Sequence, residues 1–175
     1  MHAMDRILVK RRRALAACAC AAAWPVVAAS ADEPPRRIDW PAVTLLDGTV
    51  LPPTFWQSRP AIVVFWATWC PFCRAHNVHL DALFASLDPA SAAAPRILGV
   101  ALDADRSLVA RTVAERRYRF PVTVDDGTIR PRFATRRVIP TTCLVDRTGR
   151  LVDTIAGEMF EEDVMELPAT LARRS

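Results

Sequence analysis

The sequence feature that most constrains the fold is an uninterrupted apolar run, residues 61–67, which leads within three residues into a pair of cysteines. The run reads Ala-Ile-Val-Val-Phe-Trp-Ala and is apolar at both alternating positions. A strand built from it must be covered on both faces, which is typical of a central strand in an α/β sheet. A chain of 175 residues is long enough to bury one such domain.

The neighbouring segments predict the other elements of a mixed β-sheet with helices on both faces. Upstream, Asp47-Gly48 between two short apolar segments, 43–46 and 49–51, is a hairpin signal. Downstream, apolar periodicity predicts strands over 96–102, 141–146 and 151–156, and helices over 70–87, 105–118 and 160–172. The helix over 160–172 contains Pro168, at which it could be interrupted. In the helix over 105–118, Leu108, Val109 and Val113 are expected to point inward. This order of elements indicates an α/β fold with an extra N-terminal β-hairpin.

The first 31 residues have the pattern of an export signal. A basic cluster at 10–13 precedes an alanine-rich apolar run at 14–23, and Ala29-Ser30-Ala31 matches a small-x-small cleavage site. We therefore expect a signal peptide over 1–31, a linker over 32–39, a single domain over 40–175 and a periplasmic location. A leader retained as a membrane anchor remains an alternative, and the sequence leaves open whether export uses the general or the twin-arginine route.

Removing the leader changes the charge and the cysteine count. The whole chain carries a formal charge of +4, but residues 32–175 contain 18 arginines and 18 acidic residues. The basic balance therefore does not indicate a nucleic-acid partner. Cys18 and Cys20 leave with the leader, whereas Cys70, Cys73 and Cys143 remain in a compartment where disulfides persist. Three cysteines are too few for a disulfide scaffold, and a close pair indicates chemistry instead.

Cys70 and Cys73 stand three apart where the buried strand gives way to a helix. Pro71 suits the first helical position, and the free N–H groups of that helix end favour a thiolate at Cys70, which we expect to be exposed. Cys73 lies one turn further, within bonding reach. The pattern predicts disulfide exchange in which Cys70 attacks and Cys73 resolves the mixed disulfide. A structural disulfide is the alternative, whereas a zinc site would need a second ligand pair, so no metal is expected.

A resemblance to the thioredoxin-like superfamily rests on two motifs: FWATWCPFC at 65–73, and Val138-Ile139-Pro140-Thr141-Thr142 with the Leu144-Val145-Asp146 strand. The front hairpin and Arg147-Thr148-Gly149-Arg150 resemble, more narrowly, the exported TlpA/ResA-like thiol–disulfide oxidoreductases. The resemblance covers most of residues 40–172 and implies a thioredoxin-like sheet. It also implies that Pro140 is a cis-proline beside the cysteines, which exposes the backbone of Ile139 for pairing with a substrate segment.

The chain departs from this family pattern at two positions. Val64 stands where thioredoxin-like reductases often carry a buried acid, and His76 stands where TlpA/ResA-like members often carry a glutamate. Helical periodicity places His76 on the inner face with Cys73, which makes it a candidate proton carrier for that thiol. A partly buried histidine that caps the helix edge is the alternative, and His79 is expected to be structural.

Other residues near the motifs are assigned by pattern. Trp69 is expected in an apolar docking surface and Trp66 in the core, and the Pro71-Phe72 spacer indicates an intermediate reduction potential. Cys143 on a buried strand reads as a core thiol, with a third redox partner as the alternative. The basic segment 116–137 and the acidic segment 151–172 are either solvated faces or a docking patch for an acidic partner.

These features together predict an exported protein thiol–disulfide oxidoreductase that is a monomer, uses no cofactor and reduces disulfides of partner proteins. The resemblance implies partners in cytochrome c maturation or copper-site thiols, and a membrane-linked reductant. A disulfide oxidase or isomerase is one alternative, and a potential near about −120 mV would favour it. A copper(I)-binding chaperone that uses Cys70, Cys73 and His76 is another, tested by whether the reduced protein retains copper(I) against a chelator.

Overall fold

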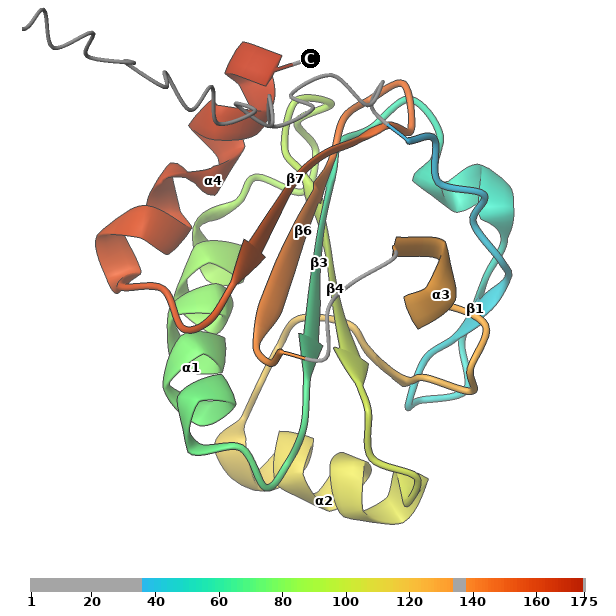
Figure 1. The fold of residues 1–175 in the computed structure, drawn as a ribbon, viewed down its shortest axis with the longest axis vertical. Coiled ribbons are helices and arrows are strands. Elements are labelled where there is room, and N and C mark those ends of the chain that lie inside the picture. Colours follow the sequence, from blue (N-terminus) through green and yellow to red (C-terminus); the bar gives the residue numbers. More distant parts are fainter. Residues whose placement is uncertain (1–35, 134–137, 175) are drawn as a thin grey trace, which may run out of the picture. The chain divides into compact units, whose positions relative to one another are not determined.

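A five-stranded mixed sheet, in the order β5-β4-β3-β6-β7, forms the centre of the domain in the computed structural model, which describes residues 36–133 and 138–174 (Figure 1). Its strands are β3 (Ala61–Trp66), β4 (Arg96–Ala101), β5 (Val122–Val124), β6 (Thr141–Val145) and β7 (Leu151–Ala156). Strands β3, β4 and β5 run parallel, whereas β6 is antiparallel to both β3 and β7. The predicted export signal, residues 1–31, lies outside the described ranges.

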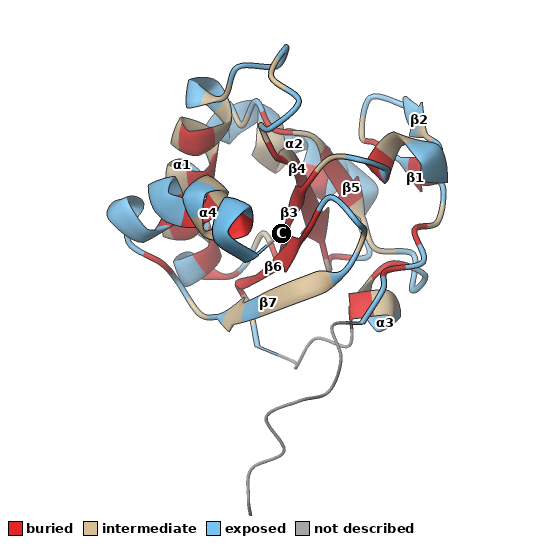
Figure 2. Cartoon of the chain, turned by 90° about the horizontal axis from the view of Figure 1, so that it is seen from above, coloured by how far each residue is buried: buried red, intermediate tan, exposed pale blue. Residues whose placement is uncertain are grey.

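The central strand β3 organises a core on each side of the sheet because its side chains alternate between the two faces. Ile62 and Val64 belong to one apolar cluster, whereas Val63 and Phe65 belong to the other. All residues of β3 are buried (Figure 2), which confirms the prediction of a central strand covered on both faces.

Two long helices, α1 (Pro71–Ser86) and α4 (Glu161–Arg174), cover the first face of the sheet (Figure 2). Their buried apolar side chains are Leu80, Leu83, Val164, Leu167 and Leu171. The interruption allowed for at Pro168 does not occur, because α4 continues through this residue. The buried leucines before and after Pro168 hold the helix against the sheet although the proline removes one backbone donor.

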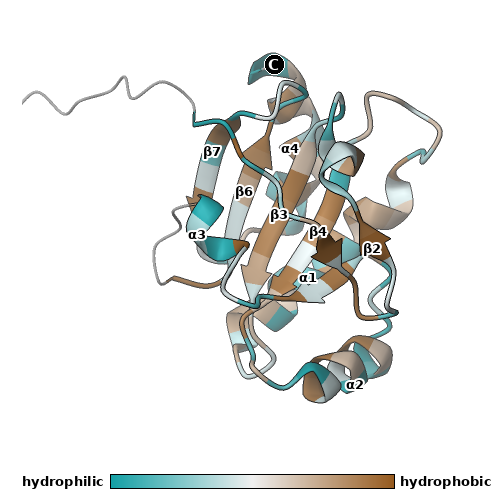
Figure 3. Ribbon diagram, turned by 90° about the vertical axis from the view of Figure 1, so that its right-hand side faces the viewer, coloured by the Kyte–Doolittle hydropathy of each residue, from teal (hydrophilic) through white to brown (hydrophobic). Residues whose placement is uncertain are grey.

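The N-terminal part of the domain covers the second face, which Figure 3 views from its outer side. It contains the predicted hairpin of β1 (Val43–Thr44) and β2 (Val50–Leu51), the 3-10 helix η1 (Pro53–Trp56) and the short helix α3 (Arg130–Phe133). Its buried side chains include Ile38, Trp40, Val43, Leu45, Trp56, Ile129 and Phe133. Two of them, Trp40 and Trp56, stack with ring centroids 4.1 Å apart.

Residues 36–39, which belong to the expected linker, are folded onto the domain. The backbone N–H of Leu151 donates to the carbonyl of Arg36 at 2.7 Å, and that of Ile38 donates to the carbonyl of Gly149 at 2.8 Å. Ile38 is buried. The folded part of the chain therefore begins before residue 40. The sequence did not predict this, because a single apolar residue among charged neighbours shows no periodicity.

Three short elements of the fold, and the orientation of one side chain, differ from the sequence prediction. The missed elements are η1, β5 and α3, none longer than four residues, so their hydrophobic pattern is too short to read. In helix α2 (Arg106–Arg116), Val109 is buried and Val113 half-buried, as expected. The prediction that Leu108 points inward was wrong, since this residue is 38% exposed. The short helix α2 packs against the core mainly through Val109.

Candidate dithiol active site

Cys70 and Cys73 lie at the beginning of α1, directly after the central strand. Cys70 is the N-cap residue, and Pro71 takes the first helical position. The backbone N–H of Cys73 donates to the sulfur of Cys70 at 3.3 Å. A helix N-terminus with an N–H directed at sulfur suits a thiolate, so the geometry favours negative charge at this end of the helix.

The thiol of Cys73 is in a different environment, fully buried one turn into the helix. Burial is the main cause that raises its pKa to about 12, and the hydrogen bond with Cys70 adds to the rise. The negative charge of Asp103 acts in the same direction. Cys73 is therefore a neutral thiol near pH 7, and it becomes a nucleophile only when a proton acceptor takes its proton.

Cys70 itself is less accessible than expected. Only 4% of the residue is exposed, which corrects the prediction of an exposed cysteine. The carbonyl oxygen of Ile139 lies 3.9 Å from its sulfur, so a segment distant in sequence covers one side. The flanking aromatic residues are instead the exposed ones, with Trp69 at 72% and Phe72 at 61%. The exposed surface next to Cys70 in the chain therefore consists partly of these two aromatic rings.

The Ile139–Pro140 peptide bond is cis, as the resemblance implied, and Pro140 is buried. Pro140 leads into β6, which pairs with β3, the strand that leads to Cys70. This pairing explains why Cys70 and Ile139, 69 residues apart in the chain, meet at the same end of the sheet.

The buried carboxylate of Asp103 was missed at the sequence level. One oxygen accepts a hydrogen bond from the Thr68 backbone N–H at 3.0 Å, and the other accepts from the Thr68 hydroxyl at 2.6 Å. Asp103 is 8% exposed. It follows β4, whose parallel pairing with β3 brings the carboxyl ends of both strands together. Asp103 therefore fixes the turn that carries Trp69 and Cys70. The sequence feature that could have identified it is its position, as an acidic residue just after a predicted buried strand.

Replacing Asp103 by alanine is expected to lower the free energy of unfolding by about 2 kcal/mol, because two donors lose a charged acceptor in a largely buried place. Denaturant unfolding measures the change. The matched control is Asp88→Ala, whose carboxylate accepts one backbone N–H in an exposed turn and should cost about 0.5 kcal/mol. Equal losses in the two variants would contradict the role of Asp103.

His76 lies on the inner face of α1, as predicted, and is fully buried. Its Nδ1 accepts the backbone N–H of Met159 at 3.3 Å, so the proton of the neutral ring is on Nε2, which donates to the Thr142 hydroxyl at 3.2 Å. Burial, with a smaller effect of the His79 charge, lowers the pKa of His76 to about 4. No hydrogen bond joins His76 to Cys73 in the described part of the chain. A role as proton carrier stays a prediction.

Cys143 and Trp66 are buried, as predicted. Cys143 is buried in β6 opposite Val63, on the second face of the sheet, whereas Cys73 lies on the first. Burial raises the pKa of Cys143 to about 12. Trp66 is in the core and Trp69 is exposed. Among residues 36–133 and 138–174, no group of three or more His, Cys, Asp and Glu side chains is arranged to hold a metal ion.

Known proteins with similar sequences include thiol–disulfide oxidoreductases. The profile of the AhpC/TSA family matches residues 41–154. The thiol-disulfide oxidoreductase ResA of Bacillus cereus is 27% identical over 124 residues, which cover 70% of this chain and 69% of that protein. The soluble secreted antigen MPT53 of Mycobacterium tuberculosis is 34% identical over 113 residues, 61% of this chain and 57% of that protein.

Solved structures have the same fold. A thioredoxin family thiol:disulfide interchange protein from Chlorobium tepidum aligns with a TM-score of 0.71 at 20% identity, covering 81% of this chain and 99% of the other. A secreted Mycobacterium tuberculosis disulfide oxidoreductase, described as homologous to DsbE of E. coli, gives 0.64 at 25% identity, covering 74% and 95%. These matches confirm the thioredoxin-like mixed sheet with its extra hairpin. The chain belongs to the AhpC/TSA family and is a protein thiol–disulfide oxidoreductase of the ResA/DsbE type.

Proposed function

We propose that this protein is exported and reduces disulfides in partner proteins, with Cys70 as the attacking thiol and Cys73 as the resolving thiol. One observation carries the proposal. The Cys70 sulfur caps α1, where it accepts the Cys73 N–H, whereas the Cys73 thiol is fully buried and its pKa is raised to about 12. This asymmetry supports the order of attack, because only the first sulfur lies where a thiolate is favoured and at the edge of the surface.

The exchange proceeds in two balanced steps. The Cys70 thiolate attacks one sulfur of the partner disulfide, so a mixed disulfide forms and the other partner sulfur leaves as a thiolate that takes up a proton. Cys73 then loses its proton and attacks the Cys70 sulfur, which releases the second partner thiol. The partner gains two electrons and two protons, and Cys70 and Cys73 become a disulfide. An external dithiol must return the two electrons before the next cycle.

The surface around Cys70 supports a protein substrate. The carbonyl of Ile139 stands 3.9 Å from the Cys70 sulfur, which lets an extended substrate segment pair with this backbone as it presents its disulfide. Trp69 and Phe72, which flank Cys70 and Pro71 in the chain, are exposed, so apolar substrate side chains can cover them. In this proposal Ile139 and Pro140 align the substrate chain, and the two rings hold it.

Export and the choice of partners form part of the same proposal. The pattern of residues 1–31 supports a signal peptide, and two of the relatives are described as secreted. In the part of the chain that the structure describes, no helix is both long and apolar enough to cross a bilayer. We place the protein in the periplasm as a monomer that a membrane-linked reductant recharges, with apocytochrome c or copper-site thiols as its substrates.

The direction of electron flow is tested by the reduction potential. Strong oxidants of this chemistry owe their potential to a stabilised reduced form. Here Cys73 stays a buried neutral thiol with its pKa raised to about 12, and among the described residues one backbone N–H, that of Cys73, donates to the Cys70 sulfur. Equilibration with defined glutathione or dithiothreitol buffers should therefore give a potential nearer about −270 mV than −120 mV. A value near −120 mV would instead support a disulfide oxidase or isomerase.

A further inference from the structure

A small hollow of about 110 Å³ opens beside Cys70, between the first turn of α1 and the last turns of α2. Cys70 is one of its lining residues, so whatever fills the hollow lies next to the attacking sulfur. Thr68 and Thr112 add hydroxyl groups to the wall. The hollow has the size of a short polar side chain and is much too small for a separate molecule of drug size.

Two arginines line this hollow, Arg74 from α1 and Arg116 from α2. Burial raises the pKa of the Tyr118 phenol, which also lines the hollow, and the charges of both guanidinium groups partly offset that rise. Both charges are therefore close to the same hydroxyl. Within residues 36–133 and 138–174, neither arginine has a side-chain hydrogen bond or an ion pair. Glu115 is the one acid in the lining, so positive charge predominates.

The position of Arg74 is unfavourable for the fold itself. It lies in the first turn of α1, where the helix dipole disfavours a cation. Glu115 lines the same hollow, but among the described residues it forms no ion pair with Arg74. The contacts of the described residues therefore do not neutralise the Arg74 charge. Its guanidinium group remains able to bind an anion beside Cys70, because guanidinium groups match carboxylates in shape and charge.

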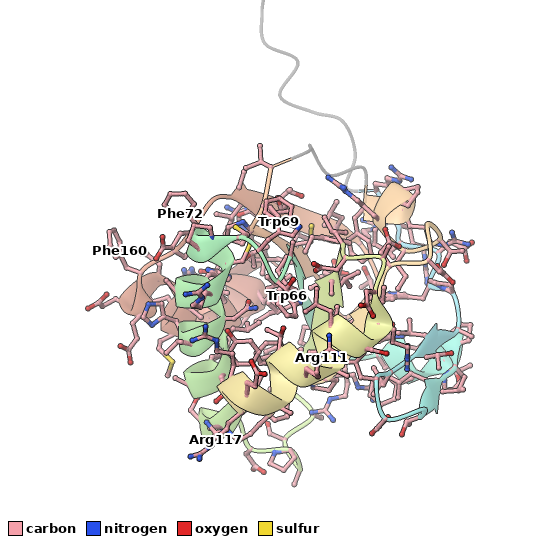
Figure 4. The ribbon with its side chains drawn as sticks, turned by 90° about the horizontal axis from the view of Figure 1, so that it is seen from below. Trp66, Trp69, Phe72, Arg111, Arg117 and Phe160 are labelled. Atoms are coloured by element: carbon pink, nitrogen blue, oxygen red, sulfur yellow. The ribbon has the colours of Figure 1, made fainter. Side chains whose placement is uncertain are left out.

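We propose that this hollow binds a carboxylate side chain of the protein substrate, next to the cysteine that Cys70 attacks. The proposal rests on the proposed function and adds a substrate class to it: disulfides with an acidic neighbour on the α2 side. Figure 4 shows the two halves of the surface, with the exposed rings of Phe72 and Phe160 on one side of Trp69 and the basic helix α2 on the other. Apolar substrate residues would cover the rings, and the acid would enter the hollow.

The test uses three otherwise identical peptides, each with a fluorophore-reporting disulfide and with Asp, Asn or Lys next to the attacked cysteine. The full mature chain in its reduced form is mixed with each peptide, and kcat/KM is measured at low and high salt. We expect the Asp peptide to react about five times faster than the Asn peptide at low salt, and the Lys peptide to be slower still. At about 1 M salt the preference should nearly vanish, because the charges are screened within about 3 Å.

The variants distinguish binding of the carboxylate in the hollow from attraction by the overall positive charge of this surface. The double variant Arg74→Gln/Arg116→Gln should react equally with the Asp and Asn peptides, whereas Arg111→Gln, an exposed arginine of α2 that does not line the hollow, should keep the wild-type preference. An unchanged preference in the double variant would overturn the proposal. So would an equal slowing of all three peptides, which would show that the arginines act on Cys70. Failure of wild type to reduce any peptide would count against the proposed function instead.

Discussion

Replacing Cys70 by serine should abolish thiol–disulfide exchange, with insulin reduction falling to the uncatalysed background. The hydroxyl oxygen cannot form the mixed disulfide, and neither of the other two cysteines in the described part of the chain can replace it. Cys73 is fully buried, with its pKa raised to about 12. Cys143 lies on the opposite face of the sheet, and burial raises its pKa to about 12 as well. The loss should therefore exceed a thousandfold, as expected for removal of a nucleophile.

The partner variant Cys73→Ser should stop the reaction half-way. Cys70 still attacks, but the mixed disulfide persists because nothing resolves it. Non-reducing gel electrophoresis after expression in cells would show partner proteins attached to Cys70, and mass spectrometry would identify them. The control is Cys143→Ala, which should reduce insulin at the wild-type rate. Adducts on Cys70→Ser but not on Cys73→Ser would reverse the order of attack proposed above.

Acid should destabilise the protein through His76. The folded-state pKa of this ring is about 4, against an ordinary value of 6.5, mainly because the ring is buried. Above pH 6.5 the ring is neutral in both states. As the pH falls from 6.5 towards 4, the unfolded chain binds a proton that the folded ring does not, so stability is lost over this window. The depressed pKa corresponds to about 3 kcal/mol.

Urea unfolding of wild type and His76→Gln at pH 7, 5.5 and 4 isolates this contribution from that of the carboxylates. The variant should be less stable at pH 7, because the links from α1 to Thr142 and Met159 are disturbed, yet it should lose about 3 kcal/mol less than wild type on acidification. His79→Gln, which removes only the smaller charge effect on His76 and the contact with Glu161, should change the pH dependence much less than His76→Gln does. Parallel pH curves for wild type and His76→Gln would contradict the assignment.

The same His76→Gln variant tests the role as proton carrier for Cys73. If the ring takes the Cys73 proton, release of the second partner thiol slows and its pH profile changes, while formation of the mixed disulfide keeps its rate. If His76 only joins the helices to the sheet, stability changes and both rates stay the same. Stopped-flow measurement of the two steps separates these outcomes, because they occur one after the other.

The long elements were predictable because their signals are local. The apolar run 61–67 could only be a strand covered on both faces, and the structure buries it in the centre of the sheet. Asp47-Gly48 marked the hairpin because two residues suffice to set a turn. The short elements β5 and α3 carried too few residues for any periodicity, so pairing with β4 and packing against Phe65 decided them.

By itself, the sequence determined the chemistry: two cysteines three apart, after a buried strand and before a proline, form a dithiol at a helix end. Helical periodicity also placed His76 on the inner face. Only the tertiary structure decided that Ile139 covers Cys70, that Asp103 holds the turn before it, and that Arg74 and Arg116 line one hollow beside Cys70. The physical reason is that spacing and periodicity act within one element, whereas burial, protonation and charge pairing depend on segments that meet only after folding.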